Sequence, residues 1–226
     1  MTVLRAAWLI ARKDLIVESR SRELVYTTLF FAVSCILVFA FAFVREGRPL
    51  EDAAAGILWV AIAFSGTLAL GRTFERERQA ETLKALLLAP VEPAAVYAGK
   101  LAGLLVLMLG VEVIVVPIVG LLFDAPILRA PLVLAGLLGA GTLGFAGVGT
   151  LFAAMLVRAH ARDVLLPVLL YPITVPVIIG GVRGTAAIFG AEPNLDVAVS
   201  WLSMLVFFDA VFVTLALWTF RPVMSD

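Results

Sequence analysis

The sequence predicts an all-α, polytopic membrane protein: six transmembrane helices in one bundle, an amphipathic N-terminal helix, and a helix in one cytoplasmic loop. Composition is the first observation behind this fold class. Of the 226 residues, 62% are hydrophobic and 15% are charged, and the mean hydropathy is +1.08, whereas soluble domains are about 45–50% apolar and about 25% charged. The second observation is that the apolar residues form six long runs. Residues 1–226 are therefore expected to form a single transmembrane domain.

Residues 1–24 predict a cytoplasmic amphipathic helix that precedes the first span. Leu4, Trp8, Ala11 and Leu15 follow one another at spacings of four, three and four, and the basic residues lie away from this stripe. A tryptophan beside Lys and Arg side chains suits the headgroup region of a bilayer. This segment is either an interfacial helix that leads into the bundle or a surface anchor with no further role.

Six apolar runs follow, and each is long enough to cross a hydrocarbon core about 30 Å thick as a helix. Backbone groups in lipid must be satisfied within the segment, so runs of this length are helices. We place the spans near residues 25–44, 53–71, 101–123, 132–157, 164–182 and 199–220.

The distribution of Lys and Arg predicts the orientation of the bundle. With the N-terminus inside, the inner segments hold thirteen of the seventeen basic residues and the outer loops hold four. This asymmetry follows the positive-inside rule and places both termini in the cytoplasm.

The inner loop at residues 72–98 is the longest charged segment between spans. Its first part carries Glu and Arg or Lys at i,i+3 spacing, as in a solvated helix. Its far end is a leucine cluster that Pro90 terminates. An exposed leucine cluster favours docking into a groove of a cytoplasmic subunit, and the alternative is packing against the cytoplasmic face of the bundle itself.

Two acidic residues lie inside the predicted spans, Glu112 in the third and Asp209 in the sixth. A charged acid at the bilayer centre is costly, so both side chains are expected to face the bundle interior. Either they line a polar pathway or form a proton-sensitive switch, or they make buried hydrogen bonds between helices. Glu112→Gln separates these interpretations.

Small residues and prolines mark the fourth and fifth spans. In the fourth, Gly136, Ala140 and Gly144 form a ridge at spacing four that allows a close helix–helix approach. The fifth contains three prolines that each remove a backbone donor, which predicts a kinked or broken helix. These are Pro167, Pro172 and Pro176.

Several chemistries are missing from the sequence. It contains no G-x-x-x-x-G-K-[ST] phosphate-binding loop and no C-x-x-C-H haem attachment site. Cys35 is the single cysteine and His160 the single histidine, so neither a disulfide nor a metal-ligand cluster is expected; His160 is expected to be an ordinary loop residue. The balanced net charge argues against a nucleic acid partner. We therefore expect a chain that is not an enzyme and binds no cofactor or metal of its own.

Five segments together resemble CcmB, the permease family of the cytochrome c maturation transporter. They are ETLKALLLAP at 81–90, YAGK at 97–100, the proline-rich stretch at 162–180, and the short motifs RKDL at 12–15 and RSRE at 20–23. The resemblance covers nearly the whole chain. It implies a fold of the type-2 ATP-binding-cassette permease kind in a bacterial inner membrane.

The resemblance also implies partners. Two permease copies would meet a CcmA-like ATPase subunit, which supplies ATP hydrolysis, and would work with a CcmC-like haem-handling membrane protein and a small CcmD-like subunit. Haem is the implied substrate, either exported itself or released on a loaded periplasmic chaperone, CcmE. In this family the segment at 75–90 corresponds to a coupling helix that touches the ATPase. The matching positions here are Glu81, Leu83, Leu86, Leu87 and Pro90.

Three other functions fit parts of the sequence. A related permease would export a lipid, drug or polysaccharide, and a proton-coupled carrier would use Glu112 and Asp209 as its coupling acids. A carrier is less favoured because the first and last three spans show no inverted repeat. A non-transporting scaffold would hold the ATPase against its haem-handling partner. Co-purification of an ATPase separates these functions.

Overall fold

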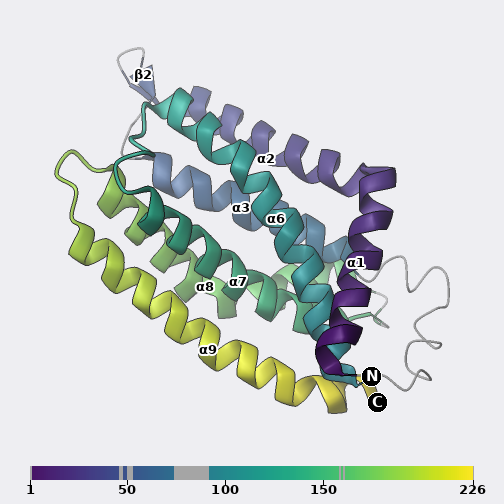
Figure 1. The fold of residues 1–226 in the computed structure, drawn as a ribbon. Coiled ribbons are helices and arrows are strands. Elements are labelled where there is room, and N and C mark those ends of the chain that lie inside the picture. The colour runs from purple at the N-terminus through teal and green to yellow at the C-terminus, as the bar shows by residue number, and fades with distance from the viewer. Residues whose placement is uncertain are drawn as a thin grey trace.

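The computed structural model describes residues 2–45, 48–49, 53–73, 92–157, 159 and 161–225. Within these ranges the regular secondary structure is helical apart from one very short hairpin (Figure 1). The elements in order are α1 (Val3–Ser21), α2 (Glu23–Ala42), β1 (Val44–Arg45), β2 (Arg48–Pro49), α3 (Ala54–Thr73), α6 (Pro93–Phe123), α7 (Pro131–Met155), α8 (Arg162–Phe189) and α9 (Leu195–Ser225).

Helices α2, α3, α6, α7, α8 and α9 are each long and apolar enough to cross a membrane, which confirms the six predicted spans. The largest boundary differences from the prediction are in α6, α8 and α9, and α9 extends from Leu195 to Ser225 where the prediction was 199–220. Residues 93–98 belong to α6 and not to the loop, because Pro93 starts the helix eight residues before the predicted edge. Helix α8 continues to Phe189, so residues 183–189 extend the fifth span beyond its predicted end at 182.

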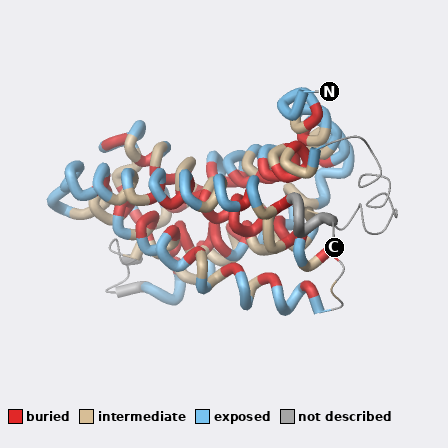
Figure 2. The backbone as a smooth tube through the Cα atoms, turned by 90° about the horizontal axis from the view of Figure 1, so that it is seen from below, coloured by how far each residue is buried: buried red, intermediate tan, exposed pale blue. Residues whose placement is uncertain are grey.

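The six spanning helices lie side by side, and α1 lies across one end of the bundle (Figure 1). The start of α1 and the end of α9 are at this same end, whereas the hairpin of β1 and β2 is at the opposite end (Figure 1). Buried residues line the interior of the bundle and exposed residues follow its outer surface (Figure 2). The surface is rich in large apolar side chains such as Phe41 and Leu132, as a lipid-facing surface requires.

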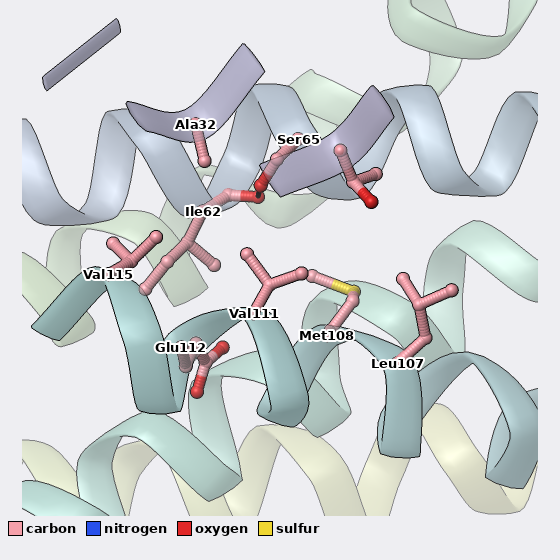
Figure 3. A pocket seen from close by; sticks show the side chains of 9 residues that line it. Ala32, Ile62, Ser65, Leu107, Met108, Val111, Glu112 and Val115 are labelled. Atoms are coloured by element: carbon pink, nitrogen blue, oxygen red, sulfur yellow. Dashed lines mark hydrogen bonds between the residues drawn. The ribbon is translucent and has the colours of Figure 1, made fainter. Parts of the chain in front are cut away.

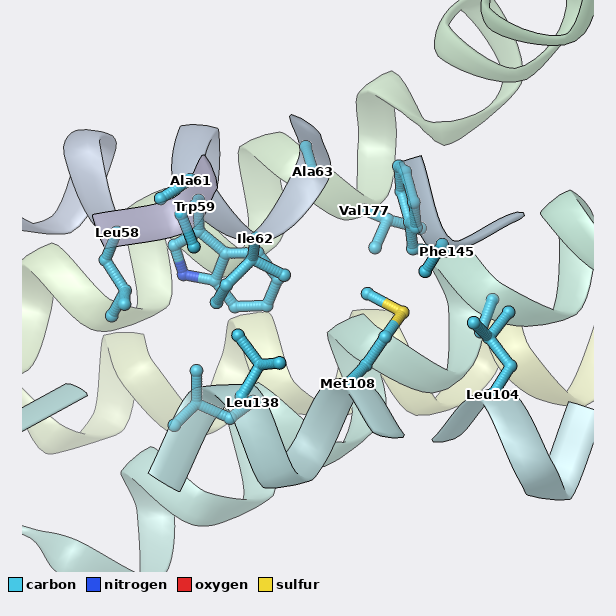
Figure 4. Close-up of a cluster of buried hydrophobic side chains, with 14 of the residues drawn as sticks. Leu58, Trp59, Ala61, Ile62, Ala63, Leu104, Met108, Leu138, Phe145 and Val177 are labelled. Carbon is cyan, nitrogen blue, oxygen red and sulfur yellow. The ribbon is translucent and has the colours of Figure 1, made fainter. Parts of the chain in front are cut away.

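Helix α7 lies in the middle of the bundle and packs against α3, α6, α8 and α9. Its glycines allow large neighbours to approach its backbone. The indole ring of Trp59 from α3 contacts Gly141 of α7 and Gly181 of α8, and its Nε1 donates a 3.0 Å hydrogen bond to the Thr185 hydroxyl. Trp59 of α3 therefore packs against α7 and α8 at the same time, inside the buried cluster that Figure 4 shows.

The predicted small-residue ridge of α7 packs against α9, which confirms its role in close packing. Cβ atoms placed at Gly136 and Gly144 would lie 3.0 Å from Leu202 Cδ2 and 2.6 Å from Asp209 Oδ1. The two contacts progress in the same direction along both helices, so α7 and α9 run parallel. A larger residue at either glycine would force the facing side chain of α9 to move.

The three prolines of the fifth span lie inside one helix. The helical backbone is continuous from Arg162 to Phe189, so the helix does not break at Pro167, Pro172 or Pro176. A bend at these positions remains a prediction. Pro117 lies inside α6 in the same way.

Candidate functional site

The predicted coupling residues fall outside the described part of the chain. Glu81, Leu83, Leu86, Leu87 and Pro90 all belong to residues 74–91, which lie between the described ranges. Both flanks of this segment are described, however. It leaves the bundle after Thr73 at the end of α3 and returns just before Glu92, which precedes α6.

Two buried cations hold the end of α3. The Arg162 guanidinium, from the first residue of α8, donates to the carbonyl oxygens of Leu70, at 3.3 Å, and Gly71. The Lys100 ammonium of α6 donates to the Thr73 carbonyl at 3.1 Å. The last carbonyls of a helix have no partner within it and carry its negative partial charge, so cations are stabilising there. The departure point of residues 74–91 is thus fixed to α6 and α8.

The same lysine attaches α1 to the bundle. Asp14 Oδ2 lies 3.0 Å from Lys100 Nζ, and Asp14 Oδ1 lies 3.0 Å from Lys13 Nζ. Beside this ion pair the backbones of α1 and α6 meet closely, because a Cβ at Gly99 would lie 2.8 Å from the Ala7 carbonyl oxygen. Helix α1 therefore rests directly on the first turns of α6.

A buried glutamate joins α1 to the first span. The Glu18 carboxylate accepts the backbone N–H groups of Leu24 and Val25 at 2.9 and 3.0 Å, which satisfies donors that the start of α2 leaves unpaired. Arg22 connects the two helices in the left-handed conformation, with φ of 53°. Glu23 then pairs at 3.5 Å with Arg72 near the end of α3. Both α1 and α2 are linked to the region where residues 74–91 depart.

The predicted apolar stripe of α1 divides between two environments. Ala11 is buried against the bundle and Leu15 is half-buried, whereas Leu4 and Trp8 are 83% and 63% exposed. The face that packs on the bundle is set by Ala11 together with the polar Asp14 and Glu18, and not by the stripe alone. Leu4 and Trp8 are left available to a bilayer surface.

The intramembrane acid Glu112 is buried between α6 and α7. Its side chain is 4% exposed and its Oε1 accepts a hydrogen bond from the Thr142 hydroxyl. Within the described residues its Oε2 has no hydrogen-bond partner. As expected from the sequence, this acid faces the interior, and it forms the kind of interhelical hydrogen bond that fixes packing.

Asp209 is buried against the backbone of α7 at Gly144, with Val177 and Phe208 alongside. Its Oδ1 also has no hydrogen-bond partner in the described part of the chain. Thr142 and Gly144 are two residues apart on α7, about 3 Å along the axis and about 200° around it. Glu112 and Asp209 therefore approach α7 from nearly opposite sides at the same depth, and the structure does not bring them together on one surface.

A small cavity lies between α2, α3 and α6 beside Glu112, with room for about one water molecule. Most of its walls are apolar, and the hydroxyls of Thr28 and Ser65 are its other polar groups. Both hydroxyls already donate to carbonyl oxygens of their own helices. Figure 3 shows the Glu112 carboxyl directed away from Ser65. The cavity thus lacks the convergent polar groups of a substrate site.

The remaining chemistry-bearing residues form no cluster among the described residues. Cys35 is half-buried in α2, and His160 lies outside the described ranges. Where side chains are described, no group of three or more His, Cys, Asp or Glu residues is placed to hold a metal ion.

Sequence reasoning missed the polar contacts around α3. In the sequence, Lys100 and Arg162 are distinguished only as basic residues next to predicted spans, yet both are at most 3% exposed. The role of Asp14 was missed as well. The motifs YAGK and RKDL contain Lys100 and Asp14, but a single sequence does not reveal that the two residues meet.

Six apolar helices with buried acids, and buried cations at one end of the bundle, define an integral, multi-pass membrane protein of the helical-bundle class. The family model described as "CcmB protein" matches residues 5–224. The chain is 34% identical over 191 residues to the protein named heme exporter protein B of Escherichia coli K12, covering 84% of each chain, and the Shigella flexneri protein of that name matches equally. The chain belongs to the CcmB family.

Proposed function

We propose that this chain is the membrane-spanning subunit of an ATP-driven exporter of the cytochrome c maturation system. The observation that carries the proposal is the CcmB match over residues 5–224, in a chain with six candidate spans. The sequence contains no phosphate-binding loop, so a separate CcmA-like subunit would hydrolyse ATP. The protein would reside in a bacterial inner membrane with both termini in the cytoplasm.

Haem is the proposed substrate, since the relatives are named heme exporter protein B. Haem carries two anionic propionates, which the bare carboxyls of Glu112 and Asp209 would repel. These acids are therefore proposed as packing residues and not as haem contacts. ATP hydrolysis would drive either haem export or the release of a haem-loaded periplasmic chaperone, together with CcmC-like and CcmD-like membrane partners and a second copy of this chain.

The ATPase would dock on the inner loop. We assign the coupling role to residues 75–90, and within them to Glu81, Leu83, Leu86 and Leu87 ahead of Pro90. Support comes from the flanks, because the end of α3 is held by Lys100 and Arg162. A segment with a firmly held base can transmit force to the bundle, whereas one with a loose base would only reorient.

Co-purification tests the proposal. Tagged protein from a native host is solubilised in mild detergent and probed for an ATPase subunit and for haem-handling membrane proteins. Leu86→Asp is expected to lower ATPase recovery by about ten-fold or more, because a carboxylate in an apolar groove costs over about 1.4 kcal/mol. Leu128→Asp is the matched control, since Leu128 is 82% exposed in the loop between α6 and α7, at the other end of the bundle.

Two results would contradict the assignment. Equal ATPase recovery with Leu86→Asp and wild type would remove the leucine cluster from the docking surface. Recovery of wild-type protein without any ATPase, combined with substrate uptake that follows a proton gradient, would favour the carrier function.

A further inference from the structure

Lys100 occupies a position where three helices meet. Its side chain is 3% exposed, and its ammonium group lies 3.0 Å from Asp14 Oδ2 of α1 and 3.1 Å from the Thr73 carbonyl oxygen of α3. A buried ammonium group is costly unless partners compensate its lost hydration. The contacts with α1 and α3 supply that compensation, so they are expected to form or break together.

Helix α1 is seated at the same level of α6. Besides the Ala7 carbonyl, the Cβ of Ile10 would lie 2.8 Å from a Cβ at Gly99, and one turn later Gly103 faces the Asp14 Cβ at 3.7 Å. Two glycines one turn apart leave no α6 side chain between the helices at this point. Helix α1 therefore packs closely on the first turns of α6.

The two cations at the end of α3 connect this helix to different parts of the molecule. Arg162 connects the Leu70 and Gly71 carbonyls to α8, within the bundle. Lys100 connects Thr73, the last residue of α3, to Asp14 on α1. Thr73 directly precedes residues 74–91, so Lys100 lies between the departure point of that segment and α1.

We propose that Lys100 is a positioning residue that couples the departure point of residues 74–91 to α1, so that ATPase movement is passed to the helix lying across the end of the bundle. This inference rests on the proposed function, because it needs an ATPase docked on that segment. It gives α1 a role beyond surface anchoring.

The first test compares two lysines that pair with the same aspartate. Lys100→Met removes the link to α3, whereas Lys13→Met removes the exposed partner of Asp14 and leaves the Lys100 contacts in place. Each variant is purified with its ATPase and haem-handling partners in lipid nanodiscs. For Lys100→Met we expect ATPase recovery and ATP hydrolysis within about two-fold of wild type, but at least about five-fold less haem-loaded chaperone per ATP, as for loss of a typical coupling energy. Lys13→Met is expected to match wild type.

A charge exchange separates coupling from simple anchoring. Asp14→Lys combined with Lys100→Asp restores the ion pair between α1 and α6, but a carboxylate at position 100 accepts hydrogen bonds and cannot donate one to the Thr73 carbonyl. We expect the thermal stability of the double variant to exceed that of Lys100→Asp alone, while the yield per ATP stays low. A restored yield would overturn the inference, as would a wild-type yield from Lys100→Met.

The last measurement needs no variant. Hydrogen exchange of the wild-type complex is followed with and without a non-hydrolysable ATP analogue. We expect nucleotide-dependent changes in peptides from residues 74–91 and from α1. A change in 74–91 with none in α1 would overturn the role of Lys100 and leave the proposed function intact. Absence of an ATPase from the wild-type complex would contradict the proposed function, and this inference with it.

Discussion

Arg162 occupies a position that is electrostatically unfavourable on its own helix. It is the first residue of α8, where the partial charge of the helix end is positive, and it is 2% exposed. Its hydrogen bonds to Leu70 and Gly71 of α3 explain this placement, because those carbonyls offer the negative partial charge that α8 does not. A charge that looks misplaced on one helix is thus well placed between two.

Arg162→Met is therefore expected to destabilise the protein. It leaves buried carbonyls of α3 unsatisfied, at about 1–3 kcal/mol, or about 2–12 °C in the midpoint of thermal unfolding for a chain of this size. Differential scanning fluorimetry in detergent measures the shift. Arg183→Met is the control, because Arg183 lies on the same helix but is exposed. A similar loss in both variants would contradict the argument.

The contact of Glu112 with Thr142 gives a second prediction at this scale. Glu112→Gln keeps an oxygen that accepts from the Thr142 hydroxyl, so formation of haem-loaded chaperone is expected to remain within about two-fold of wild type. Thr142→Val removes the donor and is expected to cost about 0.6 kcal/mol, the average for hydrogen bonds between membrane helices. Inactive but stably inserted Glu112→Gln protein would instead assign the carboxyl to a charge-based mechanism.

At the scale of the element, the glycines of α7 determine where side chains of neighbouring helices approach its backbone. Its glycines are not interchangeable: Gly141 lies against the Trp59 ring, whereas a Cβ at Gly139 would meet nothing within 4 Å. The sequence alone predicted the ridge at Gly136 and Gly144 because its spacing is regular. It could not predict the contact at Gly141, because the partner comes from a helix about eighty residues earlier.

Gly141→Ala and Gly139→Ala form a matched pair of substitutions. The first places a methyl group in the indole ring of Trp59 and is expected to cost about 1–3 kcal/mol through overpacking. The second adds the same methyl group in open space and is expected to leave the thermal unfolding midpoint unchanged or slightly raised, because alanine favours a helix. Equal midpoints for the two variants would show that α7 relaxes around position 141.

The limits of prediction at this scale have a common physical cause. Hydropathy located all six spanning helices because a run of about twenty apolar residues has the length and composition of a membrane-spanning helix. Hydropathy placed the start of α6 at residue 101 and not at Pro93, because the charged residue Lys100 interrupts the apolar run. A lysine ends a span in a lipid-facing helix, yet it is accommodated inside the helix when Asp14 and the Thr73 carbonyl surround its ammonium group.

At the scale of the whole molecule, the positive-inside asymmetry predicts which end of the bundle faces the cytoplasm. In a Cys35→Ala background, cysteines are introduced at Arg20, in α1, and at Leu128, at the far end; both positions are exposed. A membrane-impermeant maleimide is expected to label Leu128→Cys in spheroplasts and to label Arg20→Cys only after lysis. The reverse pattern would invert the proposed topology.

The central position of α7 has a consequence for how the protein is made. Its ridge is filled by α9, at Leu202 and Asp209, and the Phe220 ring of α9 packs with its centroid 5.3 Å from that of Tyr97 in α6. Because α9 leaves the ribosome after α6 and α7, the glycine surface of α7 and the Tyr97 face of α6 stay uncovered until α9 has entered the membrane. A nascent chain that stalls before residue 195 would present those surfaces to lipid, and quality-control proteases would have a structural mark by which to recognise it.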